Sequence, residues 1–165
     1  MFTVLLVEDS DSDAVLIEET LKTFADDEKF SCVRARSLRE GIGIYNLRRL
    51  GFDVVLLDLG LPECQGIDTV SRWFLEVGVR TPVIVLSGLE DKIVRVDAVR
   101  LGAQDYITKD ELVGGGGILW RAIYYAIERS KGTAEYMKRS NLELELARQK
   151  LIEIAASLHK VFVPS

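Results

Sequence analysis

The stretch Val54-Val-Leu-Leu-Asp58 decides the fold, because four consecutive apolar residues run directly into a carboxylate. An apolar run without alternation is typical of a strand that is covered on both faces, as in a parallel sheet. Comparable short runs lie at residues 3–7, 30–35, 83–86 and 105–108. The sequence therefore predicts five short strands, most of them buried.

Segments with helical spacing separate these strands. Apolar residues recur three or four positions apart at Ala14, Ile17 and Leu21, at Leu38, Ile42 and Tyr45, at Ile67, Val70, Phe74 and Val77, and at Ile93, Val96 and Val99. Gly51, Gly78 and Gly102 are placed as helix stops, whereas Gly41 and Gly43 weaken the prediction of the second helix. Strands that alternate with helices predict a doubly wound α/β fold, flavodoxin-like, with a five-stranded parallel sheet in the order 2-1-3-4-5. We expect five helices, the last of them extended into a long C-terminal helix.

Length and composition indicate one domain with an extension. A chain of 165 residues with 48% apolar and 28% charged residues is ordinary for a globular protein. The net charge of −5 argues against a nucleic-acid surface along the chain, and two cysteines do not make a disulfide framework. The N-terminus lacks a signal-peptide pattern and the apolar runs are too short to span a membrane. We therefore expect a cytoplasmic protein with no membrane contact and no direct nucleic-acid contact.

Residues 130–165 form a separate unit in this interpretation, behind a domain of residues 1–129. Met137, Leu144, Leu151 and Leu158 repeat every seven residues, as in an amphipathic helix that packs on a partner. The second seam position is filled by Ala147, Ile154 and Val161 in one register, and by Ala134, Asn141, Ala155 and Phe162 in a slipped register. We expect a coiled coil that makes a homodimer, with Gly132 softening its junction to the domain. The coiled coil would be a truncated linker to an output domain that is absent from this chain. Packing of the helix on its own domain is the alternative.

Polar residues that carry chemistry follow four of the predicted strands. Glu8 and Asp9 follow the first strand, Asp58 ends the third, Ser87 ends the fourth and Lys109 follows the fifth. The carboxyl ends of parallel strands lie on one rim of the sheet, where ligands bind. Each residue alone has an ordinary explanation, such as a turn or a helix terminus, but together they predict one site.

The chemistry of that site follows from its charges. Three carboxylates that lie close together repel one another, and a divalent cation relieves the repulsion. All-oxygen ligands with open positions favour Mg²⁺, which readily takes phosphate oxygens as further ligands. Lys109 adds positive charge on the other side, so a phosphoryl group fits between the metal and the ammonium. Asp58 is then the candidate nucleophile, because a carboxylate can accept phosphoryl as an acyl phosphate.

Four motifs carry a family resemblance. They are Val-Leu-Leu-Val before Glu8-Asp9, then Leu-Leu-Asp58-Leu-Gly-Leu-Pro62 with Gly66, then Thr-Pro82-Val-Ile-Val-Leu-Ser87-Gly88, and finally Gly102-Ala-Gln-Asp-Tyr106-Ile-Thr-Lys109. Together they resemble the receiver domain of response regulators in two-component signalling. The resemblance covers about residues 3–129, and the combination of motifs is highly specific.

The resemblance implies how the phosphorylation site works. Asp58 would accept phosphoryl from the phosphohistidine of a cognate histidine kinase. Asp9, Asp58 and the backbone carbonyl of Gly60 would bind Mg²⁺ directly, and Glu8 would hold the metal through water. Lys109 would pair with the phosphoryl group. The domain would then be a phosphoacceptor and not an enzyme, apart from catalysing its own phosphorylation and dephosphorylation.

The resemblance also implies a switch. Ser87 would give the phosphoryl group a hydrogen bond by moving toward it, and Tyr106 would turn inward. A local change of charge would thereby alter the surface made by the fourth helix, the fifth strand and the fifth helix, and with it the C-terminal dimer helix.

Two places depart from the family pattern. Asp110 stands where the family usually has proline, so we expect no cis peptide after Lys109. Residues 114–117 are four glycines where a helix should begin, which predicts a surface loop or a hinge. A P-loop is not expected there, because no lysine or serine follows in the required pattern.

A calcium-binding loop is a false lead in this sequence. Asp9, Asp11 and Asp13 resemble the start of an EF-hand. Ala14 occupies the position that needs glycine, and Thr20 the position of the final glutamate. We therefore expect no calcium site of that kind.

Two other functions remain open. A pseudo-receiver would bind partners without phosphorylation, although the complete set of acids and Lys109 argues against it. Alternatively, the chain would be a fragment of a histidine kinase, because His159 with Pro164 five residues later resembles a phosphoacceptor box. Lys160 stands where that box has an acid, and the sequence has no ATP-binding region, so this reading is less favoured.

Overall fold

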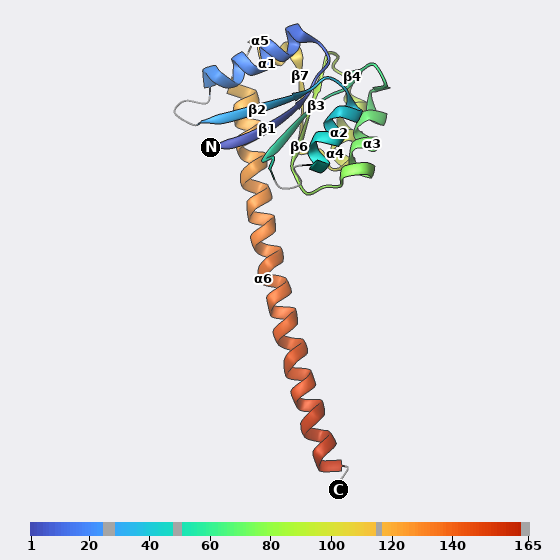
Figure 1. Cartoon of the computed structure of the whole chain (residues 1–165), viewed down its shortest axis with the longest axis vertical. Helices are drawn as coiled ribbons and strands as arrows, with labels where there is room; N and C mark the ends of the chain where they lie inside the picture. The colour runs from blue at the N-terminus through green and yellow to red at the C-terminus, as the bar shows by residue number, and fades with distance from the viewer. Residues whose placement is uncertain (25–28, 48–50, 115–116, 163–165) are drawn as a thin grey trace. The chain divides into compact units, whose positions relative to one another are not determined.

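The computed structural model describes residues 1–24, 29–47, 51–114 and 117–162, and its centre is a five-stranded parallel sheet (Figure 1). The strands are β1 (Phe2–Val7), β2 (Phe30–Ala35), β3 (Val54–Asp58), β6 (Val83–Ser87) and β7 (Asp105–Thr108). Their order in the sheet is β2-β1-β3-β6-β7. The flavodoxin-like order expected from the sequence, 2-1-3-4-5, is therefore confirmed. A two-stranded antiparallel hairpin, β4 (Gly60–Leu61) with β5 (Cys64–Gln65), follows directly after β3.

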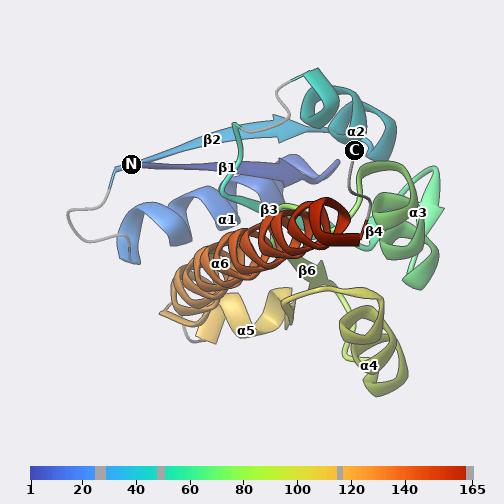
Figure 2. The same ribbon diagram turned by 90° about the horizontal axis from the view of Figure 1, so that it is seen from below.

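Helices cover both faces of the sheet. They are α1 (Asp11–Phe24), α2 (Leu38–Leu47), α3 (Ile67–Val77), α4 (Lys92–Leu101), α5 (Lys109–Gly114) and α6 (Gly117–Phe162). Val4 and Leu6 of β1 pack in one core with α1, α5 and the start of α6, whereas Leu5 and Val7 pack in another with α2 and α3. Figure 2 shows α1 on one side of the sheet and α2 and α3 on the other. This double coverage is why the central strands are apolar without alternation.

Helix α5 is one helix more than the five expected, and a capping box explains it. The Glu111 carboxylate accepts hydrogen bonds from the backbone N–H of Thr108 at 2.7 Å and from its hydroxyl at 2.9 Å. In return, the Thr108 hydroxyl oxygen accepts from the N–H of Glu111 at 3.4 Å. Thr-x-x-Glu is a recognised helix-start pattern. The cap fixes the backbone at Lys109, the first residue of α5, although Asp110 replaces the family proline.

The glycine run lies where one helix ends and the next begins, whereas Gly132 lies inside a helix. Gly114 ends α5 and Gly117 begins α6, while Gly115 and Gly116 lie outside the described residues, so the hinge stays a prediction. Gly132, by contrast, lies inside α6, and the helix continues through it. The expected softening at Gly132 is not visible as a break, because one glycine in a helix lowers its stability without ending it.

The chain divides into two compact units, Met1–Glu128 and Arg129–Ser165. In the first unit, Leu119, Ile123 and Ala126 of α6 are fully buried against the core that contains α1. In the second unit, the side chains of residues 131–159 are exposed. Within the described residues, no helix combines the length and the apolar character needed to cross a bilayer.

The two glycines of α2 make a matched pair for a stability measurement. A Cβ on Gly41 would lie 2.8 Å from Cγ2 of buried Val7, whereas a Cβ on Gly43 would meet nothing within 4 Å. We expect Gly43→Ala to stabilise the protein by about 0.5–1 kcal/mol through helix propensity. Gly41→Ala should destabilise it by about 1–3 kcal/mol through overpacking. Urea unfolding of both variants checks this, and a shift of the same sign in both would contradict it.

The capping carboxylate of Glu111 predicts a dependence on pH. Hydrogen bonds from the Thr108 backbone hold the pKa of Glu111 below its usual value, with Arg95 adding to the effect. A lowered folded-state pKa means that stability is present above the unfolded-state pKa and is lost as the pH falls through the folded-state value. Near neutral pH, Glu111→Gln should therefore cost at most about 1 kcal/mol, since the group is partly exposed.

The free energy of unfolding, measured from pH 7 down to about pH 3, checks this prediction, because the gap between wild type and variant should close in acid. The neighbouring Asp110→Asn is the control, since Asp110 is an exposed acid of the same helical turn. The expectation fails if Asp110→Asn shows as large a gap as Glu111→Gln.

Candidate functional site

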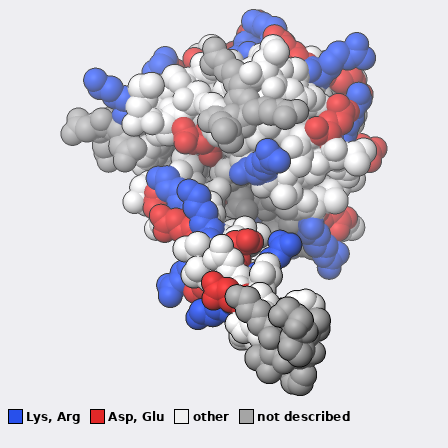
Figure 3. Space-filling view, turned by 60° about the horizontal axis from the view of Figure 1, so that its bottom comes forward, with Lys and Arg blue, Asp and Glu red and all other residues white. Residues whose placement is uncertain are grey.

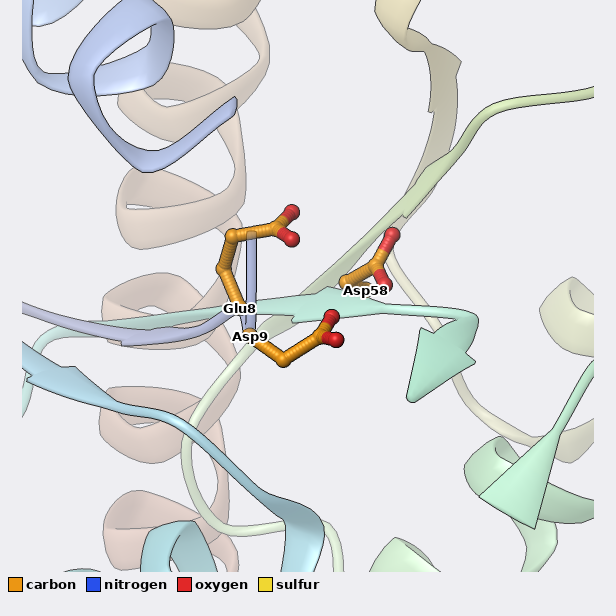
Figure 4. A group of neighbouring side chains, drawn as sticks. All are labelled: Glu8, Asp9 and Asp58. Carbon is orange, nitrogen blue, oxygen red and sulfur yellow. The ribbon is translucent and has the colours of Figure 1, made fainter. Parts of the chain in front are cut away.

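The predicted site residues meet at the carboxyl ends of the strands. Glu8 and Asp9 directly follow β1, and Asp58 is the last residue of β3. Each of the three offers a carboxylate oxygen, and these oxygens lie within 4.8 Å of one another. Figure 4 shows the three side chains converging on one space from the two strands. The parallel arrangement of β1 and β3 thus brings together acids that are 50 residues apart in the chain.

The acids differ in burial, which matters for their chemistry. Glu8 is 0% and Asp58 2% exposed, while Asp9 is half-buried. Oxygen Oε2 of Glu8 and oxygen Oδ1 of Asp58 are buried, and within the described residues each of them contacts the Lys109 ammonium. Burial raises the pKa of Glu8 above its usual value, and the nearby Asp58 charge adds to this, although Lys109 opposes it. Buried carboxylates are costly without a compensating charge, so this arrangement needs positive charge.

Lys109 supplies one positive charge from the start of α5. Its Nζ lies 2.8 Å from Oε2 of Glu8 and 2.9 Å from Oδ1 of Asp58. It also donates a hydrogen bond of 2.6 Å to Oδ2 of Asp13 in α1. Burial disfavours the ammonium, but the contacts with Asp13, Glu8 and Asp58 outweigh it and raise the pKa of Lys109 above its usual value. Lys109 is therefore a permanent cation in this site.

One lysine does not neutralise this set of acids. Among the described residues, the carboxylates of Glu8, Asp13 and Asp58 share the one ammonium of Lys109, and Asp9 adds a fourth carboxylate beside them. Oxygen ligands without nitrogen or sulfur suit a hard divalent cation. The donor set of Glu8, Asp9 and Asp58 therefore fits such an ion.

The backbone after Asp58 comes close to its carboxylate. The N–H of Gly60 donates to Oδ2 of Asp58 at 2.8 Å, and a Cβ at Gly60 would lie 3.2 Å from the same oxygen. A side chain there would crowd the carboxylate, which explains the glycine. The role of the Gly60 carbonyl as a metal ligand stays a prediction.

Ser87 and Tyr106 lie on the other side of Asp58 and share a partner. The Ser87 hydroxyl donates to the carbonyl of Leu89 at 2.9 Å, and its oxygen accepts from the Leu89 N–H at 3.2 Å. The hydroxyl of buried Tyr106 donates to the same Leu89 carbonyl at 3.0 Å. Both residues line a hollow of about 360 Å³ between the hairpin after β3 and the start of α4, together with Gly60, Leu89 and Val94.

Sequence reasoning missed two residues of this region. Asp13 was considered only for calcium, yet it binds Lys109 across 96 positions of the chain. Arg34 of β2 donates to the carbonyls of Glu8 and Asp9, each at 3.0 Å, and pairs with Asp11 at 2.6 Å. Arg34 thereby fixes the backbone that carries the acidic pair. The signal in the sequence is a charged residue inside a predicted, mostly apolar strand, residues 30–35.

Comparison with known proteins shows the family to which this chain belongs. The profile of the response regulator receiver domain matches residues 4–113. The cell cycle transcriptional regulator CtrA of Caulobacter vibrioides is 34% identical over 136 residues, which are 80% of this chain and 53% of that protein. The cell cycle response regulator CtrA of Brucella ovis is 35% identical over 136 residues, which are again 80% of this chain and 53% of that protein. The chain thus spans about half the length of these curated relatives.

The solved structures add the fold. A response regulator receiver domain protein from Clostridium thermocellum superposes with a TM-score of 0.67 at 25% identity, covering 79% of this chain and 98% of that one. A CheY-like receiver domain protein from Methanospirillum hungatei has a TM-score of 0.62 at 20% identity, covering 81% of this chain and 98% of that one. The profile covers most of the chain, and the motifs that carry it lie at the converging strand ends. The chain therefore belongs to the response regulator receiver domain family of two-component systems.

Proposed function

We propose that Asp58 accepts a phosphoryl group from the phosphohistidine of a cognate histidine kinase, with Mg²⁺ bound beside it. The observation that carries this proposal is the buried Asp58 carboxylate, which has an ammonium at 2.9 Å and two further acids alongside. Asp9, Asp58 and the Gly60 carbonyl would hold the metal directly, and Glu8 through water. Mg²⁺ would supply charge neutralisation for the transferring group.

The proposed reaction requires little covalent chemistry from the protein. A carboxylate oxygen of Asp58 attacks phosphorus, and a new O–P bond forms as the P–N bond to the donor imidazole breaks. The electron pair of that bond returns to the imidazole nitrogen. Lys109 would pair with the phosphoryl oxygens, so that positioning and charge stabilisation carry the step.

We further propose that Ser87 and Tyr106 report phosphorylation to the surface. A phosphoryl oxygen is a stronger acceptor than a carbonyl, so the Ser87 hydroxyl would leave the Leu89 carbonyl for it. Tyr106 would then be the remaining donor to that carbonyl. The loop that leads into α4 would shift with Leu89. The surface affected is that of α4, β7 and α6, as the family resemblance implied.

The exposed tail supports a second part of the proposal, association with another copy of this chain. Met137, Leu144, Leu151 and Leu158 are all more than half exposed although they repeat every seven residues. A stripe of this kind is stable in water when a matching helix covers it. A second copy offers the same stripe, so we propose a homodimer through the C-terminal helix. On the face drawn in Figure 3, acidic and basic side chains are interspersed, and this does not favour nucleic acid as the partner.

The alternatives make different use of the same residues. A pseudo-receiver would leave the Asp58 carboxylate unmodified. A histidine kinase fragment would use His159, which is exposed on α6. Neither accounts for the convergence of Lys109 on Asp58, so the phosphoacceptor receiver remains the function that we propose.

Intact mass spectrometry after incubation with acetyl phosphate tests the phosphoacceptor. We expect the mass of one phosphoryl group to be added in the presence of Mg²⁺ and not in the presence of a chelator. Asp58→Asn should abolish the gain, because an amide oxygen does not replace the nucleophilic carboxylate. A folded wild-type protein that gains no mass would favour the pseudo-receiver.

His159→Gln is the matched control for the kinase-fragment alternative. It removes the only imidazole and leaves the Asp58 site untouched. We expect unchanged phosphorylation in this variant. A gain that survives Asp58→Asn but disappears in His159→Gln would replace the proposed function with the alternative.

Sedimentation of the whole chain at micromolar concentrations tests the dimer. Leu151→Asp places a charge in the seam of both possible registers and should weaken association at least about tenfold. Leu146→Asp is the matched control, because Leu146 is 51% exposed on the same helix but lies outside the seam in both registers. A monomeric wild-type protein, or equal loss in the two variants, would contradict the proposal.

A further inference from the structure

Among the residues that the structure describes, Lys109 contacts three carboxylates, and the proposed reaction changes them differently. Asp58 would turn into the acyl phosphate, and Glu8 would turn to the metal through water. Asp13 takes no part in either event. It also makes the shortest of the three contacts, 2.6 Å, and the one with hydrogen-bond geometry. Asp13 is thus the one partner of Lys109 that the reaction leaves unchanged.

Both ends of this hydrogen bond are held in place by the fold. Asp13 lies in the first turn of α1, where its N–H donates to the Ser10 hydroxyl oxygen at 3.3 Å. The same helix is anchored by Ala14 and Ile17, which are buried in the core. Lys109 follows β7 and begins α5, whose start is fixed by the Thr108–Glu111 capping box. The hydrogen bond therefore joins two rigid elements across the site, and the long lysine side chain is what spans them.

We propose that Asp13 is a positioning residue for phosphorylation, which holds the Lys109 ammonium at the phosphoryl site before and after Asp58 is modified. The inference rests on the proposed function of Asp58. A lysine side chain has several rotatable bonds, and fixing them in advance removes an entropic barrier from the step. The ammonium has three N–H donors, so it can keep one on Asp13 while another binds a phosphoryl oxygen.

The opposite effect is also physically conceivable, and it makes the inference refutable. Asp13 is a negative charge near the place where an anionic group must bind, so its removal could ease phosphorylation by lowering repulsion. Alanine and asparagine at position 13 separate the two effects. Both variants remove the charge, but asparagine keeps an oxygen that can accept from Lys109.

The test follows phosphorylation of the whole chain by acetyl phosphate at saturating Mg²⁺, by intact mass against time. Positioning predicts that Asp13→Ala lowers the rate about tenfold and that Asp13→Asn stays within about threefold of wild type. Glu19→Ala is the control, because Glu19 is an exposed acid of the same helix that pairs with Lys22 instead of Lys109. Its rate should change less than about twofold. A rate in Asp13→Ala that equals or exceeds that of wild type overturns the inference.

A second measurement reads the position of Lys109 without any phosphorylation. The metal-free protein is treated briefly with acetic anhydride, and acetylation of Lys109 is quantified by peptide mass. Asp13→Ala should be acetylated at Lys109 faster than wild type, because the amine has lost its hydrogen bond to Asp13, while Glu19→Ala should not. Equal acetylation in Asp13→Ala and wild type would refute the anchoring contact. If wild type itself gains no phosphoryl group, the proposed function fails and this inference falls with it, whereas a normal Asp13→Ala rate refutes the role of Asp13 alone.

Discussion

The interaction on which the site depends is the contact of one ammonium with several carboxylates at the edge of the sheet. Lys109 lies within 3 Å of carboxylate oxygens from β3, from α1 and from the residue after β1. Without Lys109, Glu8 and Asp58 would be buried anions with no compensating charge. Burying an uncompensated charge strongly lowers the stability of a folded protein. With Lys109 present, the acids remain close together, but the negative charge of the carboxylates still exceeds the positive charge of the ammonium. That excess suits the site to a divalent cation and, under the proposed function, to an anionic phosphoryl group beside the cation.

The sheet makes this concentration of charge possible. Because the central strands are covered on both faces, their backbones are rigid and their ends are held at fixed spacing. Arg34 then ties the backbone of the acidic pair to β2, and the capping box ties Lys109 to the end of β7. The acids do not relax apart to reduce their repulsion, since each is carried by an element that the core holds in place. The packing of the core therefore holds the acids close together at the rim of the sheet, despite the repulsion between their charges.

Much of this architecture was predictable from the sequence, for a physical reason. Burial on both faces leaves an uninterrupted apolar run such as residues 54–57, so strand positions and strand ends were visible, and with them Asp58 and Lys109. Helix α5 was missed because six residues carry no periodic signal, although the Thr108–Glu111 cap was present in the sequence. Asp13 was missed because a hydrogen bond across 96 positions leaves no local pattern. Gly132 lies inside α6, because neighbouring good helix formers carry the helix through it, and the softening expected there stays a prediction.

The Leu89 carbonyl shows how a change at Asp58 would reach the surface under the proposed function. Two hydroxyls, from Ser87 and Tyr106, donate to this one oxygen, so the two side chains are linked through a shared acceptor. A phosphoryl group that draws away the Ser87 hydroxyl changes the bonding of Tyr106 without touching it. Arg95 of α4 stacks over the Tyr106 ring at 5.1 Å and pairs with Glu111 at 3.6 Å. A displacement of Leu89 would therefore change the contacts of α4 and of the Thr108–Glu111 cap of α5. The same cap positions Lys109. The switch and the lysine that serves the chemistry thus depend on one connected set of polar contacts.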